Sequence, residues 1–169
     1  MKQAGQIEES PALIDRAVAL LEELEGVRQQ AYKDSVGLWT IGVGHLLTAG
    51  ERHSGQVMVD GRPVPWRTGL SLADVSALLR QDVRPYVALV RETVAVPLTD
   101  GQRVALVCFA FNVGAGAYRR STLQRKLNLG QLEAVPGQLR RWVHAGGKVV
   151  AGLVNRRERE VSVWEQGTA

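Results

Sequence analysis

Two carboxylates and a hydroxyl fall close together in the stretch from Glu25 to His45. Asp34 lies in a turn-like segment after Glu25, and Thr40 follows on a segment with strand-like alternation. Two carboxylates in contrasting surroundings are typical of glycosidic bond hydrolysis, in which one donates a proton and the other works on the opposite face of the sugar. We therefore expect Glu25 to be a general acid, Asp34 a carboxylate that supports the attacking group, and Thr40 the side chain that orients a water.

Glu25 closes an expected helix over residues 11–25, which Ser10 caps at its start. Its spacing from Ile14 and Leu21 places it on the apolar face of that helix. Burial and the negative end of the helix dipole would both disfavour the ionised carboxylate there, which suits a proton donor. The alternative is an ordinary glutamate at a helix end whose carboxylate reaches water.

The residues after this helix change to the alternation of a β-hairpin, with Gly37 near its tip. Asp34 is expected in the turn, where its carboxylate stays hydrated and ionised. Trp39 and Ile41 are expected to pack, whereas Thr40 lies on a face otherwise occupied by glycines, which leave room for a bulky ligand. The alternative is that the glycines permit a twist or bulge and that Asp34 is only a turn residue.

A further carboxylate, Asp82, falls on the apolar stripe of a long helix that is expected after a capping box at residues 71–74. A buried aspartate needs a partner, and His45 is the nearest unassigned cation to the expected site. We expect these two side chains to form a structural pair. The alternative is that Asp82 is itself catalytic.

The remaining elements are predicted from caps and periodicity. Residues 49–69 contain a second small hairpin around Asp60-Gly61 and an exposed loop histidine, His53. An apolar helix that starts at Thr99 is expected to be the central helix of a helical lobe, with Cys108 as a core residue. Three further helices are expected at residues 121–128, 132–145 and 152–164.

The composition is that of a globular protein with one domain, because 45% of its 169 residues are apolar and 22% are charged. One cysteine excludes an internal disulfide, and the three histidines stand at no zinc-type spacing, so no metal and no other cofactor is expected. Residues 1–10 are polar, and no apolar run has the length of a membrane span. We therefore expect neither a signal peptide nor a membrane anchor.

Charge is distributed unevenly along the chain. Residues 100–169 carry a net charge of +6, whereas residues 1–99 carry −2. A basic region favours an anionic partner such as nucleic acid, a bacterial envelope or an acidic polymer. Solubility accounts for the same charge equally well.

The pattern E-G-x7-D-x5-T-I-G-x-G-H, which starts at Glu25 and ends at His45, resembles the catalytic signature of the phage-type lysozymes, the endolysins of tailed phages. The resemblance continues through QDV around Asp82 and FNVGAGAYRRSTLQRKLN at residues 111–128. RRW at residues 140–142, AGGKVVAGLVNRRERE at 145–160 and Trp164 extend it, and these later segments resemble the lambdoid branch. It covers nearly the whole chain from about residue 12, with the weakest match at residues 50–69.

The resemblance implies an α+β, mainly helical lysozyme-like fold in a single domain spanning residues 1–169. A small β-hairpin lobe at about residues 26–70 and a larger helical lobe, made of about residues 71–169 plus the N-terminal helix at about 11–25, would leave a cleft between them. It implies hydrolysis, with inversion, of the β-1,4 bond between N-acetylmuramic acid and N-acetylglucosamine in peptidoglycan. The roles it implies for Glu25, Asp34 and Thr40 are those given above, of acid, activating carboxylate and water-positioning side chain.

Further positions are carried over from the family one by one. Leu46, Phe111 and Ser121 match residues that line the sugar cleft. Arg156 matches an arginine that pairs with the catalytic glutamate, and His45 with Asp82 matches an internal ion pair. The resemblance also implies a monomer that waits in the host cytoplasm until a separate membrane-hole protein, a holin, releases it to the cell wall.

Two other functions are compatible with parts of the sequence. A lytic transglycosylase needs only the acid and forms an anhydro-sugar, so it leaves Asp34 and Thr40 without a role. A non-enzymatic protein could use the basic C-terminal part, with Trp142 and Trp164 among arginines, to bind nucleic acid or anionic membranes. That reading leaves the residues from Glu25 to His45 unexplained.

Overall fold

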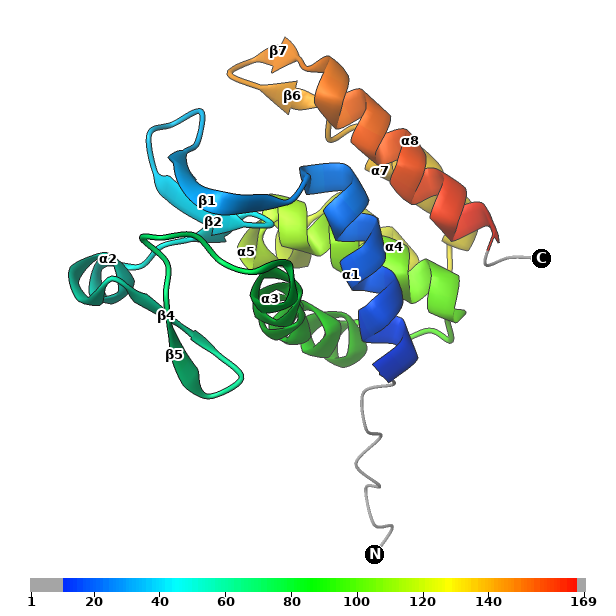
Figure 1. Cartoon of the computed structure of the whole chain (residues 1–169). Coiled ribbons are helices and arrows are strands. Elements are labelled where there is room, and N and C mark those ends of the chain that lie inside the picture. The colour runs from blue at the N-terminus through cyan, green and yellow to red at the C-terminus, as the bar shows by residue number, and fades with distance from the viewer. Residues whose placement is uncertain (1–10, 167–169) are drawn as a thin grey trace, which may run out of the picture. The chain divides into compact units, whose positions relative to one another are not determined.

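The computed structural model describes residues 11–166, which form helices and short antiparallel strands (Figure 1). Within these residues no helix combines the length and the apolar character needed to cross a bilayer. The predicted N-cap, Ser10, lies outside the described residues. The elements follow one another as α1 (Pro11–Glu25), β1 (Arg28–Lys33), β2 (Trp39–Gly42), β3 (His45–Leu46), α2 (Ala49–Ser54), β4 (Gln56–Val59), β5 (Arg62–Pro65), α3 (Leu72–Thr93), α4 (Asp100–Val113), α5 (Ala115–Arg120), α6 (Thr122–Asn128), the 3-10 helix η1 (Leu132–Ala134), α7 (Val135–Leu139), β6 (His144–Ala145), β7 (Lys148–Val149) and α8 (Ala151–Gln166).

The chain divides into two compact units. The β unit comprises Ala17–Pro85, and the helical unit comprises the described residues before Ala17 and those from Tyr86 onward. Helices α1 and α3 each contribute residues to both units.

Helix α1 has the bounds predicted from the sequence. Most of its apolar positions are buried, with Ala17 and Leu21 fully inaccessible to solvent. The helix ends because Gly26 adopts the left-handed conformation (φ +75°), which a residue without Cβ enters at little cost. Its amide donates to the Glu22 carbonyl over 3.1 Å, so the last turn is closed and the chain turns into β1.

The sheet of the β unit has the strand order β1-β2-β3, with both pairs antiparallel. The predicted second hairpin is present as β4 and β5, and its turn residues Asp60 and Gly61 both have positive φ (48° and 77°). Such a two-residue turn matches the twist of the strands that it joins. The core beneath these strands is aliphatic, with one tryptophan: Ile41, Val43, Leu47, Val57, Val59, Val64, Trp66 and Leu70, together with Val75, Leu78, Leu79 and Val83 of α3.

Helix α2 was not predicted, because its residues stand in a glycine-rich segment. Thr48 forms a complete capping box with Glu51, in which the Thr48 side chain accepts from the Glu51 amide and the Glu51 side chain accepts from the Thr48 amide. The helix ends at Gly55, which is left-handed (φ 75°). The Trp66 indole donates to the Glu51 carbonyl over 2.8 Å and attaches α2 to the segment that directly follows β5.

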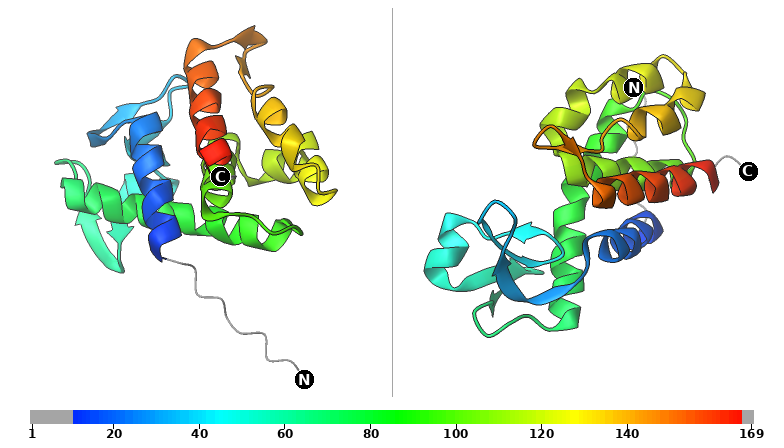
Figure 2. Two further views of the ribbon diagram at one scale, coloured as in Figure 1. Left: turned by 90° about the vertical axis from the view of Figure 1, so that its right-hand side faces the viewer. Right: turned by 90° about the horizontal axis from the view of Figure 1, so that it is seen from above.

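Helix α4 is the central helix of the helical unit, as predicted. Thr99 caps it in a box with Gln102, and every residue from Val104 to Ala110 is buried, Cys108 included. Helix α8 packs along α4 (Figure 2). The helix predicted at residues 121–128 is also present as α6, with the Ser121 hydroxyl accepting from the Gln124 amide over 3.0 Å.

The continuous helix predicted for residues 132–145 is wrong. The segment forms η1 and α7, and then the hairpin of β6 and β7. Gly146 and Gly147 both have positive φ (56° and 75°), so they form a two-residue hairpin turn in place of a helix end. Helix α8 then runs from Ala151 to Gln166, slightly longer than predicted.

Half of the polar run at residues 155–160 of α8 is buried. Arg156, Arg157 and Glu160 are buried, with 6%, 0% and 0% of their surfaces exposed. Glu160 lies between the two guanidinium groups, 3.2 Å from Arg156 Nε and 3.1 Å from Arg157 Nε. Burying these charges is possible because each guanidinium meets the opposite charge within the same helix face.

Candidate functional site

The register of β1, β2 and β3 determines which predicted site residues share a face of the sheet. Thr40 pairs with Tyr32 on one side and with Leu46 on the other. Directly paired residues of antiparallel strands point to the same face, so these three side chains form one row. The next row, Ile41 with His45, points to the opposite face.

Asp34 extends the Thr40 row at the hairpin turn. Its amide donates to the Leu38 carbonyl over 2.9 Å, so the ladder continues for one step beyond the pair of Lys33 with Trp39. A residue two positions along a strand returns to the same face, and its diagonal neighbour on the partner strand is about 7–8 Å away between Cα atoms. Asp34, Thr40 and Leu46 therefore lie on one face of the sheet.

The Asp34 carboxylate is held by the backbone of its own turn. Its Oδ1 accepts from the Val36 amide over 3.0 Å and from the Leu38 amide over 2.8 Å. Both bonds engage one oxygen, which leaves Oδ2 to accept a proton from another group. The side chain is half-buried, so the sequence-based expectation of a turn carboxylate in contact with water is met.

Thr40 is more enclosed than its sequence suggested. It is 3% exposed, and its hydroxyl donates to the Leu38 carbonyl over 3.2 Å. Because that bond consumes the hydroxyl hydrogen, the Thr40 oxygen can act only as an acceptor toward any further group.

The expectation that glycines keep a face open for ligand is wrong at Gly42. A Cβ on this residue would lie 3.6 Å from Val75 Cγ1 and 4.0 Å from Leu78 Cδ2. Helix α3 therefore lies against that face, and the positive φ of Gly42 (67°) is what favours a glycine there, in line with the alternative of a twist or bulge. Trp39, which was expected to pack, is 39% exposed on the other face, with the Lys33 ammonium 5.6 Å from its ring centroid.

Glu25 lies at the last position of α1, as predicted, but it is exposed and not desolvated. The helix ends at this residue, and neighbouring positions on both sides of the turn at Gly26 are also accessible. Periodicity placed Glu25 on the apolar stripe, but a stripe is buried only where another element covers it. Its proposed role as an acid therefore cannot rest on burial.

The predicted pair of His45 and Asp82 is present, with 2.8 Å between His45 Nδ1 and Asp82 Oδ2. The sequence did not reveal a second carboxylate: His45 Nε2 lies 3.3 Å from Glu51 Oε1. Burial alone would lower the pKa of His45, but the hydrogen bond and charge of Asp82, together with the charge of Glu51, raise it above its usual value. A protonated imidazole donates from both nitrogens, so it links β3, α2 and α3 through two carboxylates.

The other predicted residues belong to the helical unit. Phe111 is half-buried, with its ring 5.3 Å from that of Tyr86, and Ser121 is the buried N-cap of α6. The Arg156 guanidinium donates to Glu160 over 3.2 Å and to the Cys108 carbonyl over 3.2 Å. The pairing of Arg156 with Glu25 and the sugar contacts of Leu46, Phe111 and Ser121 remain predictions.

The linkage between His45 and its carboxylates predicts a pH-dependent stability. A histidine whose pKa is raised on folding stabilises fully below its unfolded pKa of about 6.5, and that contribution is lost as the pH rises through the folded pKa. The free energy of unfolding is measured by urea denaturation from acid to alkaline pH. The value for the wild type should exceed that for His45→Gln below about pH 6.5, and the two values should approach each other above the raised pKa of His45. Asp82→Asn should lower the pKa of His45 in an NMR titration.

His53→Gln is the matched control, because His53 is an exposed histidine of α2. A plot of its free energy of unfolding against pH should run parallel to that of the wild type. If the plot for His45→Gln were also parallel to that of the wild type, the pairing of His45 with Asp82 and Glu51 would not contribute to stability.

Comparison with known proteins gives one consistent result. The sequence profile of the Phage lysozyme family matches residues 22–160. The SAR-endolysin of Enterobacteria phage PA-2 is 38% identical over 145 residues, which cover 85% of this chain and 79% of the relative. Among solved structures, a P22 lysozyme mutant has 32% identity and a TM-score of 0.72, covering 88% of this chain and 94% of that chain. The muramidase domain of SpmX from Asticaccaulis excentricus has 34% identity and a TM-score of 0.71, covering 88% and 93%.

These similarities agree with the α+β fold predicted from the sequence and with the resemblance of the stretch from Glu25 to His45. The family match includes the β unit except for its first five residues and continues to Glu160 in α8. The chain belongs to the phage lysozyme family.

Proposed function

We propose that this chain hydrolyses the β-1,4 bond between N-acetylmuramic acid and N-acetylglucosamine in bacterial peptidoglycan and so lyses the host cell. Membership of the phage lysozyme family supports an enzyme of lysozyme type. The observation that carries the finer assignment is the shared sheet face of Asp34, Thr40 and Leu46, which combines a carboxylate, a hydroxyl acceptor and an accessible apolar side chain.

The hydrogen bonds of this face suggest how a water would be oriented. Thr40 Oγ1 accepts, because its hydrogen is bonded to Leu38, and Asp34 Oδ2 accepts, because the backbone amides use Oδ1. A water that donates one hydrogen to each of these oxygens keeps its lone pairs for the anomeric carbon. Asp34 then takes the proton as the water attacks, while Glu25 protonates the leaving oxygen.

Attack by a water on the face opposite the leaving group inverts the anomeric configuration and needs the wider of the two carboxylate spacings. The exposed Leu46 offers an apolar surface beside Thr40 for one face of a sugar ring. In this proposal the enzyme needs no cofactor, waits in the host cytoplasm until a holin releases it, and acts on the cell wall as a monomer.

Replacing Glu25 by Gln should abolish turnover and leave folding intact. General acid catalysis contributes about 10²–10⁴-fold to rate, and a glutamine cannot donate a proton to the leaving oxygen. Because Glu25 is exposed, the free energy of unfolding should change by no more than about 1 kcal/mol, the usual limit for an exposed ion pair. The measurement is the loss of turbidity of a peptidoglycan suspension, together with urea denaturation.

Glu23→Gln is the matched control, since Glu23 is an exposed glutamate on the same helix. It should retain the wild-type rate. Undiminished peptidoglycan hydrolysis by the Glu25 variant would remove Glu25 from the mechanism.

Thr40 provides a test of the water-positioning step. Thr40→Val has nearly the same shape but no oxygen, so kcat should fall by about 10²-fold, the usual cost of misplacing a reacting group. Thr40→Ser keeps the oxygen and should stay within about tenfold of the wild type. Equal kcat values for the Val and Ser variants, measured on solubilised peptidoglycan, would contradict the role of the hydroxyl.

A further inference from the structure

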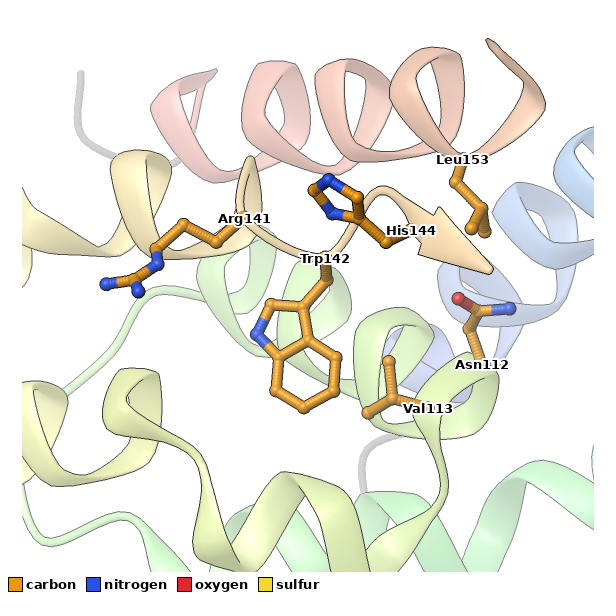
Figure 3. A pocket seen from close by; sticks show the side chains of 6 residues that line it. All are labelled: Asn112, Val113, Arg141, Trp142, His144 and Leu153. Atoms are coloured by element: carbon orange, nitrogen blue, oxygen red, sulfur yellow. The ribbon is translucent and has the colours of Figure 1, made fainter. Parts of the chain in front are cut away.

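A pocket in the helical unit lies outside the residues assigned above (Figure 3). Its cavity volume is about 390 Å³, and it is lined by Asn112, Val113, Arg141, Trp142, His144 and Leu153. The three polar residues of this lining are all exposed to solvent. Water satisfies such groups at little cost, so they do not select one polar ligand over another.

A bulge in β1 gives the β unit a more constrained arrangement. Arg28 pairs with Gly42 and Tyr32 pairs with Thr40, so four steps along β1 oppose two steps along β2. The extra residues leave the regular ladder between these two pairs. Arg28 and Tyr32 therefore face residues that are only two strand steps apart, about 7 Å, whereas a regular strand would separate them by about 13 Å.

The bulge is held by the segment between β5 and α3. The Gln29 carbonyl accepts from the Leu70 amide over 2.9 Å, and Gln29 Nε2 donates to the Leu70 carbonyl over 2.9 Å. Gln30 Nε2 donates to the Thr68 carbonyl over 3.4 Å. Gly69 between them is left-handed (φ +94°), and a Cβ there would collide with the Gln30 side-chain amide. The segment is therefore shaped to receive the bulge.

The bulge brings the Arg28 guanidinium onto the ring of Tyr32. The guanidinium carbon lies 5.0 Å from the ring centroid, a distance at which the cation is attracted to the face of the ring. Arg28 is exposed, whereas Tyr32 is half-buried. The arginine thus covers one face of the ring and holds the ring in its position beside Thr40.

Thr40 is the lowest side chain of its row. Its direct neighbours are Tyr32 and Leu46, and the Cβ atoms of such pairs lie about 4.5–5.5 Å apart. Thr40 is 3% exposed, but Leu46 is 52% exposed. The Thr40 oxygen therefore lies between two taller side chains, and one of them is a ring that is fixed in place.

We propose that Tyr32 is a specificity-determining residue that limits the nucleophile at Thr40 to water, and that Arg28 is the residue that positions its ring. The inference rests on the proposed function, because it concerns the water that Asp34 activates. Methanol is the closest alternative nucleophile, since it differs from water by one methylene group. If methanol attacked, its oxygen would bond to the anomeric carbon, its proton would pass to Asp34, and the glycosidic oxygen would leave with the proton of Glu25. The product would be a methyl glycoside in place of a reducing end.

The test is digestion of purified peptidoglycan in water that contains methanol, with methyl glycosides and reducing ends quantified by mass spectrometry. A close-fitting pocket discriminates against one extra methylene group by about 10–200-fold. The wild type should therefore favour water over methanol at least about tenfold, molecule for molecule. Tyr32→Val removes the ring but keeps a branched side chain that suits a strand, and it should bring this preference to within about threefold of unity.

Three further variants separate the ring from other causes. Tyr32→Phe keeps the ring and should retain the wild-type preference. Trp39→Ala is the matched control, because Trp39 is also an accessible aromatic residue with a cation near its ring, Lys33, but it lies on the opposite face of the sheet. It should retain the preference as well. Arg28→Gln leaves the ring in place without its cation, and should lower the preference about two- to fivefold, as expected for an exposed cation–π contact.

An unchanged preference in Tyr32→Val, or an equal fall in Trp39→Ala, would overturn the inference. A purely structural role of Tyr32 would slow attack by both nucleophiles alike and leave their ratio unchanged. If Tyr32→Val proves inactive, Arg28→Gln decides alone, since Arg28 is exposed and its replacement should leave the fold intact; a wild-type ratio there would overturn the inference. None of these outcomes touches the proposed function, because both products require cleavage of the same bond. Release of no fragments by the wild type would instead overturn the proposed function.

Discussion

The β unit depends on the antiparallel register of its three-stranded sheet. A shift of one residue in the pairing of β1 with β2 would move Thr40 to the face that holds Trp39 and would turn Ile41 out of the core. The fully buried Ile41 is the anchor, since exposing it would forfeit the burial of a large aliphatic side chain, roughly 1.5–3 kcal/mol. Packing of one row therefore fixes the position of the chemically active row beside it.

The same sheet is joined to its helices by polar contacts at its margin. His45, which pairs with Ile41 in the core row, contacts Asp82 of α3, while Glu51 contacts both His45 and the amide of Thr48. Glu51 thus caps α2 and pairs with the imidazole at once. In the helical unit, Glu160 has the comparable position between two arginines, and Arg157 extends that network to Asn112. In the β unit the imidazole itself joins elements that are distant in sequence, whereas in the helical unit the two arginines paired with Glu160 reach across to α4.

The sequence predicted most of the elements because local signals determine where they begin and end. A proline at the start of α1 and a glycine after Glu25 suffice for that helix, and the alternation around Gly37 suffices for the first hairpin. The signal for α2, a capping box at Thr48 and Glu51, was also present but stood among glycines. These features depend on a few neighbouring residues.

Burial was harder to predict, because it depends on which distant element covers a side chain. Periodicity could not show that Thr40 would be enclosed and Glu25 exposed, or that α3 would fill the space beside Gly42. The burial of Arg156 and Arg157 could not be predicted from their sequence, since the same residues on another helix would be solvated. The pocket next to Trp142 was missed for a related reason, as its lining comes from four separate segments.

The central claim is that a water held at Asp34 and Thr40 attacks the sugar. The most direct measurement is digestion of purified peptidoglycan in water enriched in oxygen-18, followed by mass spectrometry of the released fragments. The account predicts one heavy oxygen at each new reducing end, which is an N-acetylmuramic acid with a free anomeric hydroxyl. Unlabelled fragments that end in an anhydro-sugar would contradict it, because they would show that the bond is cut without water.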